Sequence, residues 1–328
     1  EIALAEGVVY MGPDDPRFDH KFEDQIGVDR FAAIEVGDEE FILSFDLAPE
    51  SHRDDVLFSL GVLRHAINQK LRQERMQEVF DQARKIQASI LPRRTPVYGG
   101  FELYGRIQPM ESVGGDFYDY IPITDKILGL AIADVSGHGL PAALQVRDIY
   151  MGLRMGMARD FKIVRTVERL NQIIHKSTLT SRFVSMFYGE LEPNGVFIYV
   201  NAGHPPPFHL SAAGDVRFLD EGGAVLGPVA DSTYERGFVR LEPGDMVVLY
   251  TDGMIEATPA DSDGGEEFGI ERLVEIARRL RGKSSKEIGE AMMKAVETYR
   301  GEGEPQDDRS VVVVTYPPTQ LPVTGSST

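Results

Sequence analysis

The stretch VGGDFYDY (residues 113–120) decides the fold, together with LAIADVSGHG (residues 130–139), which follows one hairpin later. Each stretch places an aspartate at the end of an apolar run, Asp116 in the first and Asp134 in the second. The adjacent glycines allow backbone or a ligand to approach closely. We therefore expect both aspartates to lie at strand ends.

Two later stretches repeat this arrangement. Asp252 follows the apolar run 247–250, and the acidic pair Asp307-Asp308 directly precedes the apolar run 311–314. Carboxylates gathered at strand ends repel one another unless cations occupy the space between them. The sequence therefore predicts a metal site built only from oxygen ligands.

The ligand type predicts both the metal and the chemistry. Carboxylate oxygens suit magnesium or manganese, and two such ions can activate a bridging water while they hold a phosphoryl group. Asp134 is the best candidate for a bridging ligand, because it ends an apolar strand and the carbonyl of Val135 is exposed before Gly137. Any one of these aspartates alone could instead form a turn. Together they favour hydrolytic phosphate chemistry.

The composition argues against several other classes of function. With 52 acidic and 34 basic residues among 328, the net charge of -18 repels phosphate backbones and disfavours nucleic-acid binding through a broad surface. The absence of cysteine excludes disulfides and thiolate metal sites. No apolar run approaches the length of a membrane span and no basic-then-apolar leader opens the chain, so we expect a soluble, cytoplasmic segment without membrane contact.

The first 91 residues predict a small sensory segment and a linker. Residues 1–28 indicate no element, whereas residues 30–47 form a predicted hairpin. Residues 54–91 lack Gly and Pro apart from Gly61, and their apolar residues recur at spacings of three and four, which predicts one long helix. The hairpin and helix resemble the C-terminal end of a GAF-type sensory domain, so we expect residues 1–53 to be a partial GAF-like segment.

The predicted helix carries an apolar stripe with two possible uses. Its first half suits packing on the hairpin. Its second half carries Val79, Ala83, Ile86 and Ile90. Because these approximate heptad spacing and little other sequence could cover them, we expect a parallel coiled coil that joins two chains into a homodimer. Packing of the whole helix on its own domain is the alternative.

The large domain is expected at residues 92–317, after Pro92 ends the helix, and residues 318–328 are expected to be a disordered tail. Apolar runs alternate with pairs of helical segments rather than with single crossover helices. This pattern favours an α+β fold, a sandwich of two mostly antiparallel sheets flanked by helices, over a doubly wound sheet. The predicted strands are 101–108, 116–121, 127–134, 185–191, 196–202, 207–210, 216–219, 234–241, 245–251 and 310–316, and the predicted helices are 140–159, 165–177, 270–280 and 285–299.

The motifs also recur in the order typical of a known family. Besides the two stretches quoted first, the chain carries LP at 91–92, FVSMFYG at 183–189, NAGHPPP at 201–207, LG at 226–227, YTDG at 250–253 and DD at 307–308. Over residues 90–316 this set closely resembles the bacterial RsbU/SpoIIE-type serine phosphatases of the PPM (protein phosphatase 2C-like) superfamily. The resemblance implies an αββα sandwich, two Mn²⁺ or Mg²⁺ ions, and a phosphoserine or phosphothreonine protein as the substrate.

Carried over by position, the resemblance also implies the site residues. One ion would be held by Asp134, Asp252 and Asp307, and the other by Asp134, the Val135 carbonyl and Asp116, directly or through water, which makes Asp134 and Asp116 the central catalytic residues. Asp307 is preferred to Asp308 as the ligand, because it matches the first residue of the family's final pair. Eukaryotic relatives have a histidine two residues after the bridging aspartate, where this chain has Ser136, so the general acid is unassigned.

The resemblance further implies a partner. Phosphatases of this type usually act on a phosphoserine in a small STAS-domain anti-anti-sigma protein, in bacterial stress or sigma-factor signalling. Arg147 and Arg154, on the helix after Asp134, are candidates for docking that partner. His204 is interpreted as a hydrogen-bonded imidazole in a rigid turn rather than as a catalytic residue. The alternative to an enzyme is a catalytically silent regulator that binds a phosphoprotein.

Overall fold

The computed structural model describes residues 7–13, 15–16, 30–38, 40–157, 162–177, 183–260, 265–303 and 305–318. The chain divides into two units, residues 1–81 and 82–328, and the division falls inside one long helix. Most of the predicted disordered tail, residues 319–328, lies outside the described residues. No helix in the described part of the chain is both long and apolar enough to cross a membrane.

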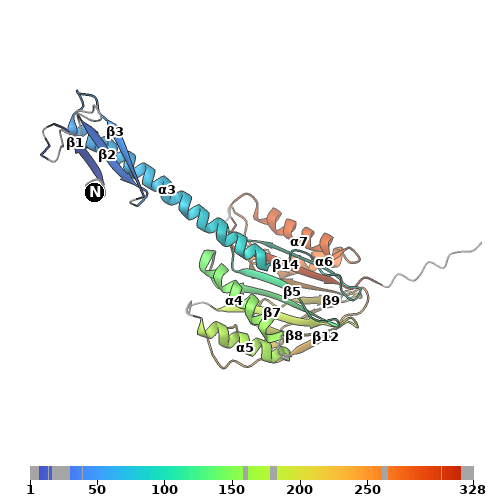
Figure 1. Ribbon diagram of the computed structural model, residues 1–328. Coiled ribbons are helices and arrows are strands. Elements are labelled where there is room, and N and C mark those ends of the chain that lie inside the picture. Colours follow the sequence, from blue (N-terminus) through green and yellow to red (C-terminus); the bar gives the residue numbers. More distant parts are fainter. Residues whose placement is uncertain are drawn as a thin grey trace, which may run out of the picture. The chain divides into compact units, whose positions relative to one another are not determined.

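The N-terminal unit is a three-stranded antiparallel sheet, in the order β1-β2-β3, packed on the first part of helix α3 (Figure 1). The predicted hairpin and long helix are both present. Alternate side chains of β2, such as Ala32 and Ile34, pack with Leu60 of the helix, because strand residues two apart share a face. β1 lies in the segment where the sequence indicated no element. The bounds are β1 Val8–Met11, β2 Phe31–Val36, β3 Phe41–Asp46 and α3 Arg53–Ile90.

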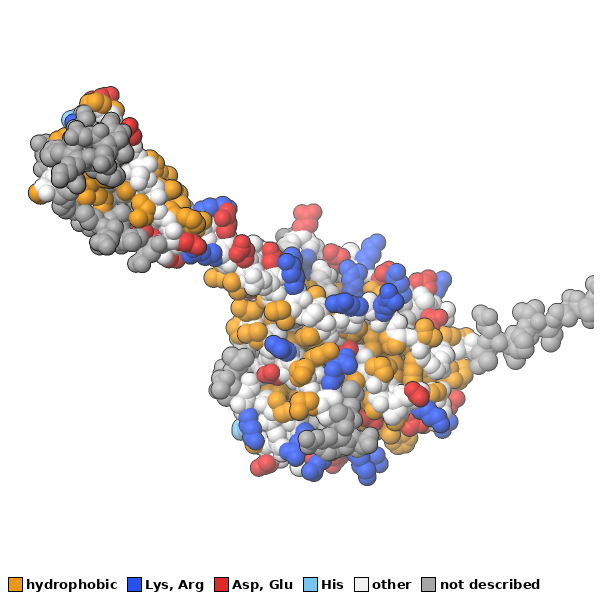
Figure 2. All heavy atoms as spheres, viewed as in Figure 1, with side chains coloured by type: hydrophobic (Ala, Val, Ile, Leu, Met, Phe, Trp, Pro, Cys, Tyr) orange, Lys and Arg blue, Asp and Glu red, His pale blue; other side chains and the backbone are white. Residues whose placement is uncertain are grey.

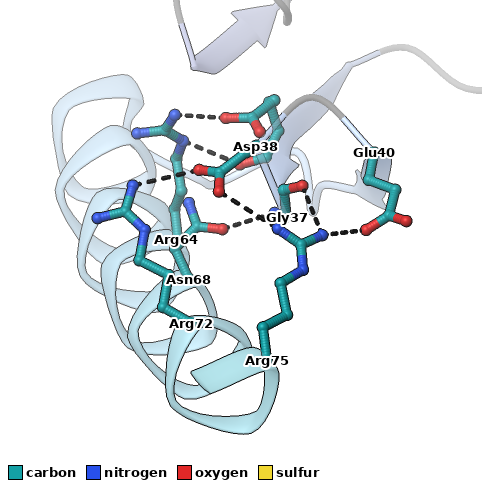
Figure 3. Close-up of polar contacts among 8 residues, drawn as sticks. Gly37, Asp38, Glu40, Arg64, Asn68, Arg72 and Arg75 are labelled. Atoms are coloured by element: carbon teal, nitrogen blue, oxygen red, sulfur yellow. Dashed lines mark hydrogen bonds and ion pairs between the residues drawn. The ribbon is translucent and has the colours of Figure 1, made fainter. Parts of the chain in front are cut away.

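Polar contacts tie the turn between β2 and β3 to α3 (Figure 3). The Gly37 N–H donates to Asn68 Oδ1 at 2.6 Å, and Arg75 Nη2 donates to the Gly37 carbonyl at 3.1 Å. Arg72 and Arg75 pair with Asp38 at 3.2 and 3.3 Å. Exposed ion pairs contribute only about 1 kcal/mol or less each, so the apolar contacts hold the hairpin and the polar ones fix its position along the helix.

The large unit is a sandwich of two sheets with a helix pair on each outer face (Figure 1). One sheet, in the order β10-β9-β13-β14-β4, is antiparallel and is covered by α6 and α7. The other, in the order β11-β8-β7-β6-β5 with β12 also paired to β8, is antiparallel except for β11 against β8 and is covered by α4 and α5. This arrangement confirms the predicted α+β sandwich.

The elements of the large unit follow the predicted order, with one added strand of two glycines, β11. The strands are β4 Glu102–Gln108, β5 Asp116–Thr124, β6 Ile127–Val135, β7 Val184–Leu191, β8 Val196–Ala202, β9 Phe208–Leu210, β10 Val216–Phe218, β11 Gly222–Gly223, β12 Gly237–Arg240, β13 Met246–Tyr250 and β14 Arg309–Thr315. The helices are α4 Gly139–Met157, α5 Ile163–Lys176, the 3₁₀ turn η1 Asp252–Met254, α6 Ile270–Arg279 and α7 Ser285–Arg300.

Side chains that alternate along each strand build the separate apolar layers. In β14, Val311 and Val313 pack against α6 and α7, whereas Val312 and Val314 pack between the two sheets. Because both faces of this strand are buried, its sequence is a continuous apolar run. The inner layer therefore fixes the two sheets relative to each other, and with them the strand ends that carry the predicted site.

An ion pair between the partly exposed Arg154 and the buried Asp119 anchors α4 on β5. Arg154 Nη2 donates to Asp119 Oδ2 at 2.7 Å, and the Arg154 guanidinium lies 4.5 Å from the centre of the Tyr150 ring. The net pKa of Asp119 is raised to about 6, because the effect of burial exceeds the opposing effect of the Arg154 charge. Arg154 thus stabilises the packing of α4. Of the two arginines expected to dock a partner, only Arg147 is fully exposed.

Candidate metal centre

Four of the predicted aspartates lie at strand ends of the two sheets. Asp116 opens β5 and is the direct cross-strand partner of Asp134, near the end of β6. Asp252 begins the turn after β13, and Asp307 lies just before β14, the neighbour of β13. The β5–β6 hairpin of one sheet and the neighbouring strands β13 and β14 of the other therefore carry these carboxylates at their ends.

The aspartates raise one another's pKa values. Burial, followed by the charges of Asp252 and Asp307, raises the pKa of Asp134 to about 8. Burial and the charge of Asp134 raise the pKa of Asp116. Partial desolvation and the charge of Asp252 also raise the pKa of Asp307, although its side chain remains accessible to solvent. A bound cation would lower all of these pKa values, because it offsets the shared negative charge.

The two carboxylate oxygens of Asp116 differ in their hydrogen bonding. Its Oδ2 accepts hydrogen bonds from Thr251 Oγ1 at 2.9 Å and from Ser310 Oγ at 2.6 Å. Its Oδ1 is buried and has no hydrogen-bond partner within the described part of the chain. An unpartnered buried carboxylate oxygen is costly, and a hard cation is the ligand that satisfies it best.

The carboxylates suit such a cation in chemistry and charge, but they are not preassembled around it. Among the described residues, no group of three or more His, Cys, Asp or Glu side chains is already arranged to hold a metal ion. Mutual repulsion keeps uncompensated carboxylates apart, so an ion would have to draw them together.

Asp308 fixes the loop that leads into Asp116. Its Oδ1 accepts the Met110 N–H at 2.7 Å, and its Oδ2 accepts the N–H groups of Gly115 at 2.6 Å and Asp116 at 3.3 Å. Asp308 is buried, whereas Asp307 is exposed. This division of roles supports Asp307, the residue preferred from the sequence, as the ligand of the pair.

The linker helix contacts the same loop through Gln87. The Gln87 Nε2 donates to the Gly114 carbonyl at 2.6 Å, and the Gly114 N–H donates to Gln87 Oε1 at 3.3 Å. A side chain at position 114 would have its Cβ 2.2 Å from Asp308 Oδ2, so only glycine fits between Gln87 and Asp308. The sequence analysis missed Gln87, because nothing local distinguishes it from the other polar residues of the helix.

The backbone of Val135 lies next to the same loop. The Val135 N–H donates to the Gly115 carbonyl at 3.2 Å, and a Cβ on Gly115 would lie 2.7 Å from the Val135 carbonyl oxygen. The glycine therefore lets the predicted carbonyl ligand come close to the start of β5. Nearby, His138 Nδ1 lies 2.7 Å from Glu111 Oε1, at an exposed position.

His204 has the structural role expected for it. Its Nδ1 lies 2.8 Å from Ser185 Oγ, and its backbone N–H donates to Asn201 Oδ1 at 2.8 Å. Burial lowers the pKa of this imidazole to about 3, so it stays neutral. The interpretation of His204 as a hydrogen-bonded turn residue is confirmed.

Thr251 and Ser310 are the other site residues that the sequence analysis missed. Thr251 directly precedes Asp252, and Ser310 follows the acidic pair with one residue between them. Hydroxyl residues within a few positions of strand-end aspartates were the available signal. Their common contact with Asp116 could not be read from the sequence, because it joins residues 135 and 194 positions apart.

Comparisons with known sequences agree with the motif order. The family model for Stage II sporulation protein E (SpoIIE) matches residues 124–317. Phosphoserine phosphatase RsbU of Bacillus subtilis (strain 168) is 28% identical over 220 residues, which cover 66% of this chain and 65% of that protein. Protein IcfG of Synechocystis sp. is 28% identical over 284 residues, which cover 74% of this chain and 43% of that protein. The chain thus spans less than two thirds of each of these relatives.

Solved structures agree with the fold. The SiaA-PP2C domain of Pseudomonas aeruginosa has a TM-score of 0.65 at 21% identity, covering 74% of this chain and 97% of that one. The RsbU and RsbW domains of Rv1364c from Mycobacterium tuberculosis have a TM-score of 0.57 at 23% identity, covering 67% of this chain and 61% of that one. Since the family model also covers more than half of the sequence, the chain belongs to the SpoIIE family and has a PP2C-type fold.

Proposed function

We propose that the chain is a metal-dependent phosphatase that removes phosphate from phosphoserine or phosphothreonine in a protein. The observation that carries this proposal is the group of strand-end carboxylates that raise one another's pKa. The name of the relative RsbU, a phosphoserine phosphatase, supports it. Two Mn²⁺ or Mg²⁺ ions, held by Asp116, Asp134, the Val135 carbonyl, Asp252 and Asp307, would supply an activated water and bind the phosphoryl oxygens.

The residues around these ligands orient them. Thr251 and Ser310 hold Asp116 Oδ2, which leaves the unpartnered Oδ1 available as the proposed ligand atom. Asp308 and Gln87 both hold the preceding loop through its backbone. Preorganisation of this kind keeps the ligand in place when substrate binds, which lowers the cost of assembling the site.

Removal of metal should abolish activity. The purified protein is expected to hydrolyse p-nitrophenyl phosphate with Mn²⁺ or Mg²⁺, to lose that activity in EDTA and to regain it when Mn²⁺ is added back. Zn²⁺ should substitute poorly, because the proposed ligands are all oxygen. A folded protein that shows no metal-stimulated hydrolysis of this compound or of a phosphoprotein would favour the catalytically silent regulator instead.

We propose that the substrate is a phosphoserine in a STAS-domain anti-anti-sigma protein, so that dephosphorylation controls a sigma factor. Membership of the SpoIIE family and the similarity to RsbU support this substrate class. Because such a regulator acts on transcription, we place the phosphatase in the cytoplasm with it. The exposed Arg147 on α4, the helix that begins five residues after Asp134, is the proposed docking residue.

We also propose that the linker helix joins two copies of the chain. Of the predicted stripe, Val79 and Ile86 are 47% and 54% exposed, and Met76 before them is 58% exposed, which leaves apolar side chains of α3 in contact with water. Ile90, by contrast, is partly buried against the core of the large unit. Figure 2 shows apolar side chains (orange) at the surface of the N-terminal unit as well. A parallel coiled coil would bury this stripe, and Gln87 lies next to Ile86, so pairing could act on the loop before Asp116.

Mass in solution tests the proposed dimer. Light scattering at micromolar concentration is expected to give the mass of two chains, and Ile86→Asp is expected to give the mass of one, because it buries an unpaired charge in the coiled-coil seam. Lys85→Asp, a change at the exposed neighbouring position, is the control and should remain dimeric. A monomeric native protein would contradict the proposal.

A further inference from the structure

A second charged feature lies beside Asp307, outside the proposed metal ligands. A pocket of about 110 Å³ is lined by Arg300 and Arg309 together with Glu256, Gln306, Gly253 and Asp307. This volume is several times what one water molecule needs. The pocket shares Asp307 with the proposed metal centre, and Gly253 directly follows another proposed ligand.

The strand geometry explains why Arg309 lies in this pocket. Val311 and Val313 pack against α6 and α7, and Arg309, two residues before Val311, belongs to the same face of β14. Arg300 is the last residue of α7, on that side of the sheet. Asp308 points to the opposite side, where it holds the loop before β5. Asp308 and Arg309 are adjacent in the chain, but one contacts the loop beside the proposed metal centre and the other lines the pocket.

Within the described residues neither arginine forms an ion pair, and Arg300 donates one hydrogen bond from Nη1, to the Gly303 carbonyl. Arg309 is only 3% exposed, yet neither of its Nη atoms has a hydrogen-bond partner among the residues that the structure describes. The buried Nε of Arg300 is also without one in the described part of the chain. Glu297 of α7 attracts the Arg309 charge but forms no ion pair with it within the described residues. A buried, unsatisfied guanidinium is costly, so this site is suited to an anionic ligand.

We propose that this pocket binds an oxyanion next to the metal centre. The planar fork of a guanidinium matches the oxygens of phosphate and carboxylate. The proposal rests on the proposed function. Without a metal ion, the negative charge of Asp307 offsets the positive charge of the arginines in the pocket, and a cation bound to Asp307 would leave that positive charge for an anion. Two sources share this chemistry: the phosphate released by hydrolysis, and an acidic group of the protein substrate close to its phosphoserine.

Calorimetric titration of inorganic phosphate into the Mg²⁺-loaded protein tests the pocket without turnover. Arg309→Gln and Arg300→Gln are each expected to weaken phosphate binding by about tenfold or more, because each removes charge-assisted hydrogen bonds. Arg278→Gln, the same change at an exposed position of α6 outside the pocket, should bind phosphate like the wild type. Arg300→Gln tests the pocket independently if loss of the more deeply buried Arg309 impairs folding.

The kinetics of the same variants distinguish the two sources. If weakened phosphate binding is accompanied by a higher KM for p-nitrophenyl phosphate, the pocket holds the released phosphate. If weakened phosphate binding is accompanied by an unchanged KM for p-nitrophenyl phosphate and a KM for the phosphoprotein that rises about tenfold, the pocket holds an acidic group of the substrate. Folded variants that bind phosphate like the wild type overturn the proposal. A protein that binds phosphate through these arginines but hydrolyses nothing would contradict the proposed function and leave the pocket standing.

Discussion

Asp134→Asn is expected to abolish metal-dependent hydrolysis and, in the same protein, to stabilise the metal-free fold. Asp134 is the proposed ligand of both ions, so its loss should lower kcat by more than about 100-fold. A loss of about 100-fold is the most expected when a residue only supports a metal ligand. The stability gain follows because Asn keeps the shape of the side chain but removes a buried charge that Asp252 and Asp307 repel. Initial rates with Mn²⁺ and urea unfolding in EDTA measure the two effects.

The stability gain should depend on pH with a defined sign. The pKa of Asp134 is raised to about 8 in the folded metal-free protein, against roughly 4 in an unfolded chain. Between these values the folded state binds more protons, so wild-type stability falls as pH rises through this window. The variant has no carboxyl group at position 134, so its free energy of unfolding should exceed that of the wild type by roughly 1–3 kcal/mol at pH 8 and by little near pH 4. The difference at pH 8 is kept to this range because the neighbouring carboxylates share the titration.

A matched control exists in the same hairpin. Asp125 lies in the exposed turn at the other end of β5 and β6, and Asp125→Asn makes the same chemical change there. It should leave both the metal-dependent rate and the stability in EDTA within error of the wild type. Substantial activity in Asp134→Asn would reject Asp134 as a ligand, and a loss of stability in EDTA would mean that its charge is compensated in the fold.

The sandwich could be predicted because each layer leaves a local pattern in the sequence. β13 and β14 are buried on both faces and appear as continuous apolar runs, and both covering helix pairs repeat at helical spacing. β1 was missed because four residues between glycines and prolines carry little periodic signal. β11 was missed for a related reason, since its two glycines pair with β8 only through their backbone.

The proposed metal ligands could be predicted, because each is a single residue near the end of an apolar run. The aspartates stand out because a charge directly beside an apolar run is uncommon. The residues that position them do not, because Gln87, Thr251 and Ser310 act across long sequence separations. Arg154 shows the same limit, since a helical arginine suggested an exposed docking residue until its buried partner Asp119 was known.

Asp307 and Asp308 are adjacent in the sequence but have different contacts, so we expect alanine to affect stability at one position and activity at the other. Asp308→Ala should destabilise the protein by roughly 3–5 kcal/mol, because the N–H groups of Met110, Gly115 and Asp116 would lose a charged acceptor and stay buried. Relief of carboxylate repulsion offsets only part of this cost. The urea midpoint of the metal-free protein measures the loss.

Asp307→Ala should instead leave that midpoint nearly unchanged and remove metal-dependent activity. The Asp307 side chain is exposed, and the one hydrogen bond described for it is to the neighbouring Asp308 N–H at 2.8 Å. Its substitution should therefore weaken Mn²⁺ binding, measured by calorimetry, and lower kcat by more than about 100-fold while the fold stays intact. The reverse result, a stable Asp308→Ala protein that no longer binds Mn²⁺ beside a fully active Asp307→Ala protein, would exchange the two roles. In that case Asp307 would lie beside the metal site without binding the ion. Asp308 would be the ligand, and the bound ion would hold the loop before β5 in place.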